Sequence, residues 1–259
     1  MSLKDVLVIA PFVCFVVLFF LQTWLPRRSL SQSGYPRVIH NLLLFVVNSV
    51  IMRLLVPLSL IAVANYASEN TWGVFNAINF LAAPLVVIIC VIALDFAIYW
   101  QHVATHKWEI LWRLHKVHHA DHDMDVTTAI RFHPIELVLS LIYKSALVSL
   151  LGVPVFAVII FELLLFIGPA FNHSNLAIPV WLDSKLRMVI ATPDVHRAHH
   201  STKIAEQNTN YGFFLIWWDK MFNTYTETPD EGHVTMNIGL LDPNQRYVKV
   251  DEMLLAPFR

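Results

Sequence analysis

Residues 80–106 read FLAAPLVVIICVIALDFAIYWQHVATH, an apolar run that ends directly in two histidines four residues apart. From residue 80 to residue 101 the run contains one charged residue, Asp95. It is long enough to cross about 30 Å of hydrocarbon as a helix. Residues four apart share one helical face, so His102 and His106 should project together just beyond the span. The stretch predicts a membrane helix that brings a pair of imidazoles to one membrane surface.

The composition of the whole chain also indicates a membrane protein. Of its 259 residues, 56% are hydrophobic and 14% are charged, whereas an ordinary soluble domain is about 45–50% apolar and about 25% charged. The formal net charge of −1 gives no indication of a nucleic-acid partner. Cys14 and Cys90 both lie in apolar runs, so we expect no disulfide framework.

Other apolar stretches predict the rest of a helical bundle. Residues 6–25 carry no charge, and no small-residue cleavage site follows them, which favours a membrane span over a signal peptide. Residues 41–65 form another run, in which Arg53 should face protein or water. Residues 135–151 and 153–171 are joined by a short Gly-Val-Pro link and predict a helical hairpin. Because Lys144 lies within that hairpin, it could be partly re-entrant.

Positive charge predicts the orientation of these spans. The loop at 26–40 holds three arginines, whereas the loop at 66–79 holds Glu69 and no Lys or Arg. Cytoplasmic loops are enriched in Lys and Arg, so we expect the first loop in the cytoplasm and the N-terminus outside. Following the chain from there places every clustered histidine on the cytoplasmic side. We therefore expect one all-α domain over residues 1–259, a multi-pass bundle of about four transmembrane helices with a cytosolic helical cap that carries the histidines.

Most of the 13 histidines stand in three clusters. The second and third clusters both have the spacing His-x-x-His-His, which places all three rings on one helical face. The clustered residues are His102, His106, His115, His118, His119, His196, His199 and His200. Eight imidazoles are too many for one ion and suit two ions with open coordination positions. We expect these side chains to act as ligands and not as acid–base catalysts.

The alternative to a metal site is that these histidines are unrelated surface or core residues. It suits the isolated His40, His122 and His233, but not three clusters on one predicted membrane side. Neutral imidazole binds iron, copper and zinc. Zinc sites often include Cys, and none lies near the clusters, but spacing alone leaves iron and copper open. Asp95 lies on the same helical stripe as His102 and is expected to accept an N–H from a ligand histidine.

The three clusters resemble the histidine boxes of the fatty acid hydroxylase/sterol desaturase superfamily. Companion motifs are also similar to that family, over about residues 85–226: Arg-Phe-His-Pro-Ile-Glu (131–136), Asn-His-Ser-Asn (172–175), Thr-Pro-Asp (192–194), Asn-Tyr-Gly (210–212) and Trp-Asp (218–219). The resemblance implies a di-iron centre that uses O2, a membrane lipid as substrate, and four transmembrane helices capped by a cytosolic helical domain. It also implies an external electron donor, here expected to be a separate protein, because no cytochrome b5-like domain is recognisable at either end.

The resemblance implies further residues of the site. His173 is expected to join the metal ligands. The alternative is that His173 only hydrogen-bonds the backbone at the end of its helix. His133 and Asp194 are expected to support the ligands, although His133 could be a ligand and Asp194 could cap the helix of the third box. Asn208 and Asn223 depart from the family pattern outside the expected ligands, which leaves the subfamily open.

The expected activity is the O2-dependent hydroxylation or desaturation of an unactivated C–H bond in a lipid of the sterol, fatty acyl or ether-lipid class. The Arg-Phe-His-Pro-x-Glu stretch slightly favours the branch with sterol desaturase-like and alkylglycerol monooxygenase-like members. A membrane protein that binds or transports metal with the same histidines is the alternative. A transporter should place its ligands near the bilayer midplane, whereas the boxes here follow the ends of the spans. The oligomeric state is left open.

Overall fold

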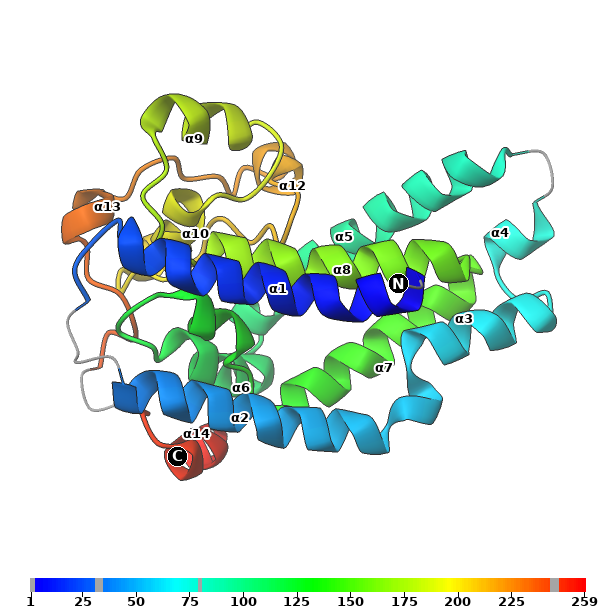
Figure 1. The fold of residues 1–259 in the computed structure, drawn as a ribbon, viewed down its shortest axis with the longest axis horizontal. Coiled ribbons are helices and arrows are strands. Elements are labelled where there is room, and N and C mark those ends of the chain that lie inside the picture. Colours follow the sequence, from blue (N-terminus) through cyan, green and yellow to red (C-terminus); the bar gives the residue numbers. More distant parts are fainter. Residues whose placement is uncertain (1–2, 31–34, 79–80, 243–246) are drawn as a thin grey trace.

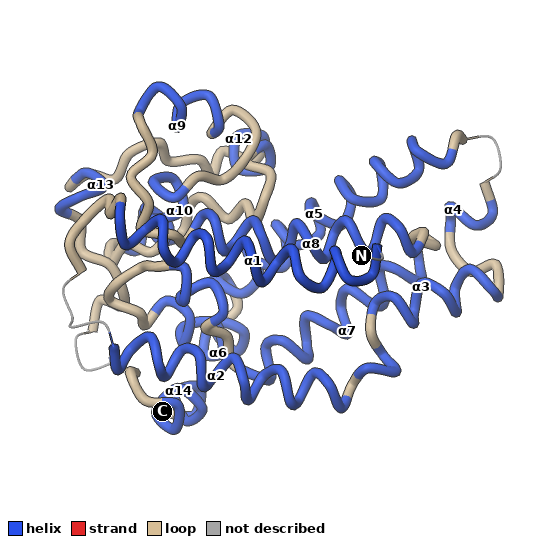
Figure 2. Tube along the Cα trace, viewed as in Figure 1, coloured by secondary structure: helices blue, strands red, loops and turns tan. Residues whose placement is uncertain are grey.

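The computed structural model describes residues 3–30, 35–78, 81–242 and 247–259. In these ranges the chain forms helices and loops, and it contains no β-strand, only three isolated bridges between single residues. Figure 2 shows long helices running through the molecule, with most of the short helices and loops at one end and α3 (Leu60–Glu69) and α4 (Val74–Ala77) at the other. The all-α class predicted from the sequence is therefore confirmed.

Four of the described helices are long and apolar enough to cross a membrane: α2 (Tyr35–Leu54), α5 (Ala83–Lys107), α7 (Pro134–Leu151) and α8 (Val155–Asn172). This agrees with the expected bundle of about four helices that are long and apolar enough to span a membrane. Helix α1 (Leu3–Trp24) covers the predicted first span and packs along α8 (Figure 1). Its apolar part with described side chains, Ile9–Trp24, is shorter than the other four.

The predicted run at 41–65 is not one continuous helix. Helix α2 ends at Leu54, and a 3-10 turn (η1, Val56–Leu58) separates it from α3 (Leu60–Glu69). The break coincides with Pro57, which has no backbone N–H to continue the helix. As a result Arg53 lies exposed in the last turn of α2 and not in the middle of a span.

The predicted hairpin at 135–171 is present as α7 and α8. Each helix has 18 residues, which at ~1.5 Å per residue is about 27 Å and close to the thickness of the hydrocarbon core. Both can therefore cross fully, and a re-entrant path is not needed. Gly152 ends α7 with a φ of 69°, and a Cβ there would lie 2.7 Å from the carbonyl oxygen of Trp72. Only glycine fits this turn without strain.

Helix α5 forms the third predicted span and continues beyond it to Lys107. It starts at Ala83, and residue 80, where the predicted run begins, lies outside the described residues. Leu94 of α5, Leu141 of α7 and Phe161 of α8 belong to one buried apolar cluster in the bundle. The bundle core thus fixes α5 against the hairpin, so the end of α5 that carries histidines has a defined position.

The short elements lie at the two ends of the bundle (Figure 1). Helices α3 and α4 (Val74–Ala77) lie at one end. The other end carries the cap, formed by α6 (Glu109–His119), η2 (Val126–Ile130), α9 (Val180–Leu186), α10 (Pro193–His199), α11 (Ile204–Gln207), α12 (Trp217–Met221), α13 (Gly232–Thr235), α14 (Val250–Leu255) and η3 (Ala256–Phe258). All three histidine boxes lie at the cap end.

Candidate metal centre

Two consecutive helices deliver the first two boxes. Helix α5 carries His102 and His106 in its last two turns, and the chain turns at Trp108 before α6 begins. Trp108 has an extended backbone (φ −103°, ψ 117°), which ends one helix and starts the next at a different angle. Because α6 folds back and packs on α5, its box faces the box of α5.

The third box lies on α10, and a ninth histidine lies at the end of α8. Thr192 precedes α10, and Pro193 stands at its first position, where its missing N–H costs no hydrogen bond. His200 is the C-cap of α10, and His173 is the C-cap of α8. Helices α8 and α10 pack on each other, which brings His173 to the third box.

The nine histidines converge in two groups. In each group, one ring nitrogen of every member lies within 4.8 Å of those of all other members. The five-histidine group consists of His102, His106, His115, His119 and His199, and the four-histidine group consists of His118, His173, His196 and His200. All nine sequence-predicted ligand positions are brought together, including His173.

Each His-x-x-His-His box contributes to both groups. In α6, His115 and His119, one turn apart, join the five-histidine group, and His118 joins the other. The third box does the reverse, because His196 and His200 join the four-histidine group and His199 joins the five-histidine group. The two boxes therefore hold the two groups side by side, which a single i, i+4 pair could not do.

Backbone carbonyls orient several of the rings. Nδ1 lies 2.7 Å from the Tyr211 carbonyl in His102, 2.7 Å from the Thr209 carbonyl in His199 and 2.8 Å from the Pro169 carbonyl in His173. A carbonyl oxygen only accepts, so Nδ1 carries the proton and Nε2 presents a lone pair. These contacts hold neutral imidazoles in the tautomer that can bind a metal through Nε2.

Glu136 supplies the carboxylate partner that the sequence analysis did not identify. Its Oε1 lies 2.7 Å from Nδ1 of His115, and both side chains are buried. Glu136 follows Pro134 in the first turn of α7 and is separated from His115 by 21 residues. The only available signal was the acidic residue that closes the Arg-Phe-His-Pro-Ile-Glu motif, because no local spacing links it to a box.

Buried nitrogens without partners test whether a metal fits. Within the described ranges, Nε2 of His102, His106, His115 and His199 is buried and has no hydrogen-bond partner. In the other group, Nε2 of His173 lies 3.0 Å from that of His118, 3.1 Å from that of His196 and 3.3 Å from that of His200. Unpaired buried polar atoms are costly. His173 carries its proton on Nδ1, so its Nε2 offers one lone pair to three neighbouring ring nitrogens and cannot satisfy all of them. A cation in each group would bind the unpaired ring nitrogens of that group, so the residues fit a pair of metal ions.

The protein environment keeps the cap histidines neutral. Burial, followed by the neighbouring imidazoles, lowers the pKa of His118, His119, His196 and His200 well below the ordinary histidine value. Burial likewise lowers the pKa of His173 to about 4 and that of His199 to about 3. A metal ligand must be deprotonated, so burial favours the form of these rings that can bind a metal, and in His173 and His199 the carbonyl contacts also fix the tautomer.

The loop after the third box supports His102 through a carboxylate. Asp219 accepts hydrogen bonds from the backbone N–H groups of Tyr211 (2.8 Å) and Gly212 (2.7 Å). A Cβ on Gly212 would lie 2.8 Å from Oδ2 of Asp219, so a larger residue would push the loop away. The Asn-Tyr-Gly and Trp-Asp motifs thus act together to place the Tyr211 carbonyl against His102.

Three predicted supporting residues have partners other than a ligand histidine. Asp95 accepts a hydrogen bond from the indole N–H of Trp218 (2.7 Å). Trp218 lies 123 residues further along the chain, so the helical stripe that contains Asp95 gave no sign of this contact. His133 caps α7 by accepting from the Ile135 N–H and also contacts the Leu254 carbonyl. It lies in neither histidine group.

The third of these residues, Asp194, neither caps its helix nor bonds a ligand. The N-cap of α10 is Thr192, and Asp194 pairs with Arg27 at 2.9 Å and with Arg197 of the third box. Arg27 follows α1 in the chain, so the pair ties the end of α1 to the start of α10. Asp194 therefore fixes the helix that carries the box and not an individual ring.

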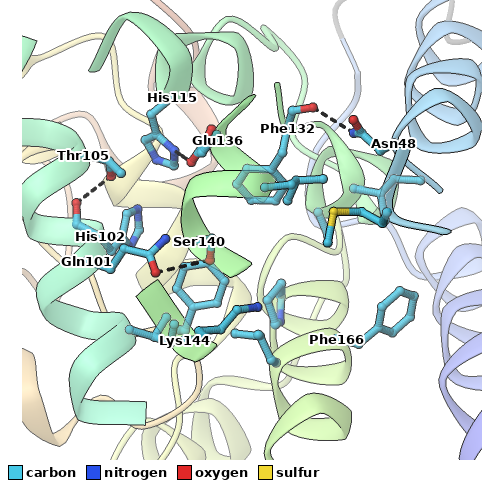
Figure 3. Close-up of a pocket in the computed structure, with 18 of the residues that line it drawn as sticks. Asn48, Gln101, His102, Thr105, His115, Phe132, Glu136, Ser140, Lys144 and Phe166 are labelled. Carbon is cyan, nitrogen blue, oxygen red and sulfur yellow. Dashed lines mark hydrogen bonds and ion pairs between the residues drawn. The ribbon is translucent and has the colours of Figure 1, made fainter. Parts of the chain in front are cut away.

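An apolar cavity of about 350 Å³ adjoins the five-histidine group (Figure 3). His102, His115 and Glu136 form its inner end, and the rest of the wall is mostly aliphatic and aromatic side chains from α2, α5, α7 and α8. None of the four-histidine group lines this cavity. A ligand in the cavity would therefore lie beside one group and be separated from the other.

Comparison with known proteins gives consistent relatives. The fatty acid hydroxylase family model matches residues 87–224, which contain all nine histidines. The chain is 32% identical to the ornithine lipid hydroxylase OlsE of Rhizobium tropici, over 55% of this chain and 42% of that protein. It is 29% identical to human alkylglycerol monooxygenase, over 52% of this chain and 29% of that protein.

The similarity to these relatives covers only part of each protein. The chain spans less than half the length of both curated relatives. No solved structure matches the chain significantly. The family model nevertheless covers more than half of the chain, and its matched region contains the whole histidine site. The chain belongs to the fatty acid hydroxylase family.

Proposed function

We propose that this protein is a di-iron enzyme that uses O2 to hydroxylate or desaturate an unactivated C–H bond of a membrane lipid. One observation supports this most strongly: two groups of imidazoles lie side by side inside the protein, and the five-histidine group adjoins an apolar cavity. The named activities of the relatives, a lipid hydroxylase and a monooxygenase, agree with this reaction class.

In this proposal one iron is held by each histidine group. All nine histidines then act as metal ligands, and each iron keeps a coordination position that is not permanently filled by a histidine. Imidazole also suits copper and zinc, but zinc has no redox chemistry, and iron is the metal that the family resemblance implies. When bound, the metal pair supplies the redox chemistry that activates O2, with electrons from a separate donor protein.

The residues of the chain position the reactants and exclude water. Backbone carbonyls orient three ligand rings; they belong to Tyr211, Thr209 and Pro169. The Glu136 carboxylate orients His115 by accepting a hydrogen bond from its Nδ1–H. The apolar cavity wall holds a hydrocarbon chain beside His102 and His115, where a C–H bond can approach the centre. A closed apolar site also protects reactive species from solvent.

The orientation in the membrane is also a proposal. Arg27 pairs with the third-box helix, and Arg28 donates to the Met236 carbonyl in the cap. These arginines thus lie at the same end as the histidines, and positive charge favours the cytoplasmic side. We propose that the cap faces the cytoplasm, the N-terminus lies outside, and residues 1–259 form one domain with its catalytic region at about 85–226.

Metal analysis and product analysis test the proposed function. The purified full chain should contain two irons, and lipids from cells that express it should show products heavier by one oxygen or lighter by two hydrogens. His118→Ala and His199→Ala, one from each group, should lose iron and turnover, whereas His233→Ala should retain both because His233 belongs to neither group. Full activity in either box variant, or haem absorbance in the purified protein, would contradict the proposal.

A further inference from the structure

Lys144 lies in the wall of the cavity that adjoins the five-histidine group. It sits on α7, and its side chain extends into the cavity (Figure 3). Among the described residues it forms neither a hydrogen bond nor an ion pair. A charged side chain inside a membrane bundle is costly and normally faces a polar partner or a functional pathway. An unpaired ammonium in a mostly apolar cavity therefore points to a ligand.

The position of Lys144 relates it to the metal centre. Glu136, Ser140 and Lys144 are spaced by four residues on one face of α7, and all three line the cavity. The eight residues from Glu136 to Lys144 correspond to ~12 Å along the helix. Because Glu136 bonds His115, the cavity has the metal centre at one end and the ammonium about two turns away.

The nearest acidic group does not neutralise Lys144. Glu162 on α8 attracts the ammonium through space, but the two form no ion pair. Glu162 is exposed on the surface of the bundle and does not line the cavity. Its carboxylate therefore leaves the hydrogen-bonding positions of the ammonium free on the cavity side.

Three of the other polar side chains on the cavity wall donate to backbone carbonyls: Asn48, Ser49 and Thr105. Ser140 donates to Oε1 of Gln101 at 3.2 Å, so the amide nitrogen of Gln101 is left as a second donor near Lys144. A cation with a neighbouring donor in an apolar wall matches an anionic oxygen group carried on a hydrocarbon chain. Carboxylates and phosphates have this chemistry and form charge-assisted hydrogen bonds with an ammonium.

We propose that Lys144 binds the anionic oxygen group, a carboxylate or a phosphate, of the lipid that occupies the cavity. This inference rests on the proposed function, since it assigns the class of substrate to the same site. Lys144 then sets the distance between the anionic group and the C–H bond presented to the metal centre. The enzyme should prefer an anionic lipid to a neutral lipid with the same chain.

Equilibrium binding to the purified full chain in a nonionic detergent tests the proposal. The probes are palmitate and its methyl ester, and 1-palmitoyl-glycerol 3-phosphate and 1-palmitoyl-glycerol. Lys144→Met should weaken binding of an anionic probe by about tenfold or more, the loss expected for a charge-assisted hydrogen bond. Binding of its neutral counterpart should change little. The pair that shows this difference identifies the source, either a carboxylate or a phosphate.

Two further variants separate a specific role from a structural one. Lys144→Arg keeps the cation and should retain the preference for the anionic probe. Lys185→Met removes an exposed lysine outside the cavity and should leave all four affinities unchanged. If Lys144→Met does not fold, Lys144→Gln takes its place in the same comparison.

Binding and metal content are measured on the same samples, so the two proposals can fail separately. Absence of iron in the wild-type protein would overturn the di-iron proposal and leave the binding result valid. Equal affinities of wild type and Lys144→Met for every probe would overturn the role of Lys144. An equal loss for anionic and neutral probes would also overturn it, because that pattern shows only a packing role.

Discussion

The two histidine groups differ in their access to the rest of the molecule. The five-histidine group borders the lipid-sized cavity through His102 and His115, and it includes His106, the one member of the nine that is only partly buried. The four members of the other group are each at most 2% exposed, and none lines that cavity. The groups are thus neighbours with unequal surroundings, one open on two sides and one enclosed.

In the proposed di-iron enzyme, this difference would give the two histidine groups different tasks. His106 also borders an outer cavity of about 480 Å³, lined largely by polar residues of α5, α6 and the segment after the third box. The five-histidine group therefore lies between a polar entrance and an apolar one. We infer that the reacting C–H bond meets the metal of this group, while the enclosed group serves as a fixed partner that holds the second metal.

The largest effect should come from removing one ligand of the enclosed group. It has four histidines and no spare member, so His196→Ala should empty this position and lower turnover by more than about 100-fold, beyond the loss typical of an outer-sphere partner. His106→Ala removes the one partly buried member of the five-histidine group, at its outer edge, and should retain more iron. Iron content and turnover of both variants provide the measurement. Equal iron loss in the two would remove the distinction between the groups.

Chelation should reveal the same difference in the wild-type protein. A chelator can reach the five-histidine group through the outer cavity at His106, whereas the other group opens only when the cap unfolds locally. Iron should therefore leave in two phases of similar amplitude, with rates separated by about tenfold or more. Loss of iron in a single phase would show that both positions are equally accessible.

Removing the charge of Glu136, which bonds His115, should have a smaller effect that is confined to the five-histidine group. Glu136→Gln keeps a hydrogen-bond acceptor for His115 but removes the negative charge, and such changes weaken metal binding by about tenfold. Only the metal of the five-histidine group should be affected, so the fast phase of chelation should become faster while the slow phase stays the same. Glu69→Gln, which changes an exposed glutamate on α3 at the other end of the bundle, is the matched control. A change in the slow phase would contradict the assignment.

The sequence predicted which histidines converge better than it predicted their arrangement. Spacings of three and four residues identified all eight boxed histidines, because these are local properties of a helix, and the family resemblance added His173. That each box is divided between two groups was not predicted, because it depends on how α6 and α10 face each other. Glu136 was missed for the same reason.

The errors in the fold and in the supporting residues have similar causes. Hydropathy predicted one helix at 41–65 because it gives no weight to the missing N–H of Pro57. The helical stripe predicted that Asp95 accepts an N–H from a ligand histidine, but its carboxylate accepts from the indole N–H of Trp218, which lies in a distant segment. Contacts of this range depend on tertiary packing, which one sequence does not reveal.

The supports of the two boxes also differ, and this gives the last prediction. Beyond the end of α6, Arg37 of α2 pairs with Asp121 at 2.8 Å and with Asp125, and all three side chains are at most 3% exposed. At the start of α10, Arg27 pairs with Asp194, and the Arg27 side chain is 28% exposed. Breaking a buried pair leaves an uncompensated charge and costs about 3–5 kcal/mol, whereas a partly exposed pair contributes about 1 kcal/mol or less.

Thermal unfolding should therefore separate Arg37→Met from Arg27→Gln, with the larger loss of stability in Arg37→Met. The pH dependence identifies the group responsible. Burial opposes ionisation of Asp121, but Arg37 and Arg131 outweigh it and hold the pKa of this carboxyl below its ordinary value. Its stabilising contribution is then complete above the unfolded value of about 3.9 and is lost as the pH falls through the lower folded value. Arg37→Met should remove much of this acid-dependent part of the stability, and an unchanged acid profile would mean that Arg131 and the neighbouring hydroxyl groups are sufficient to hold Asp121.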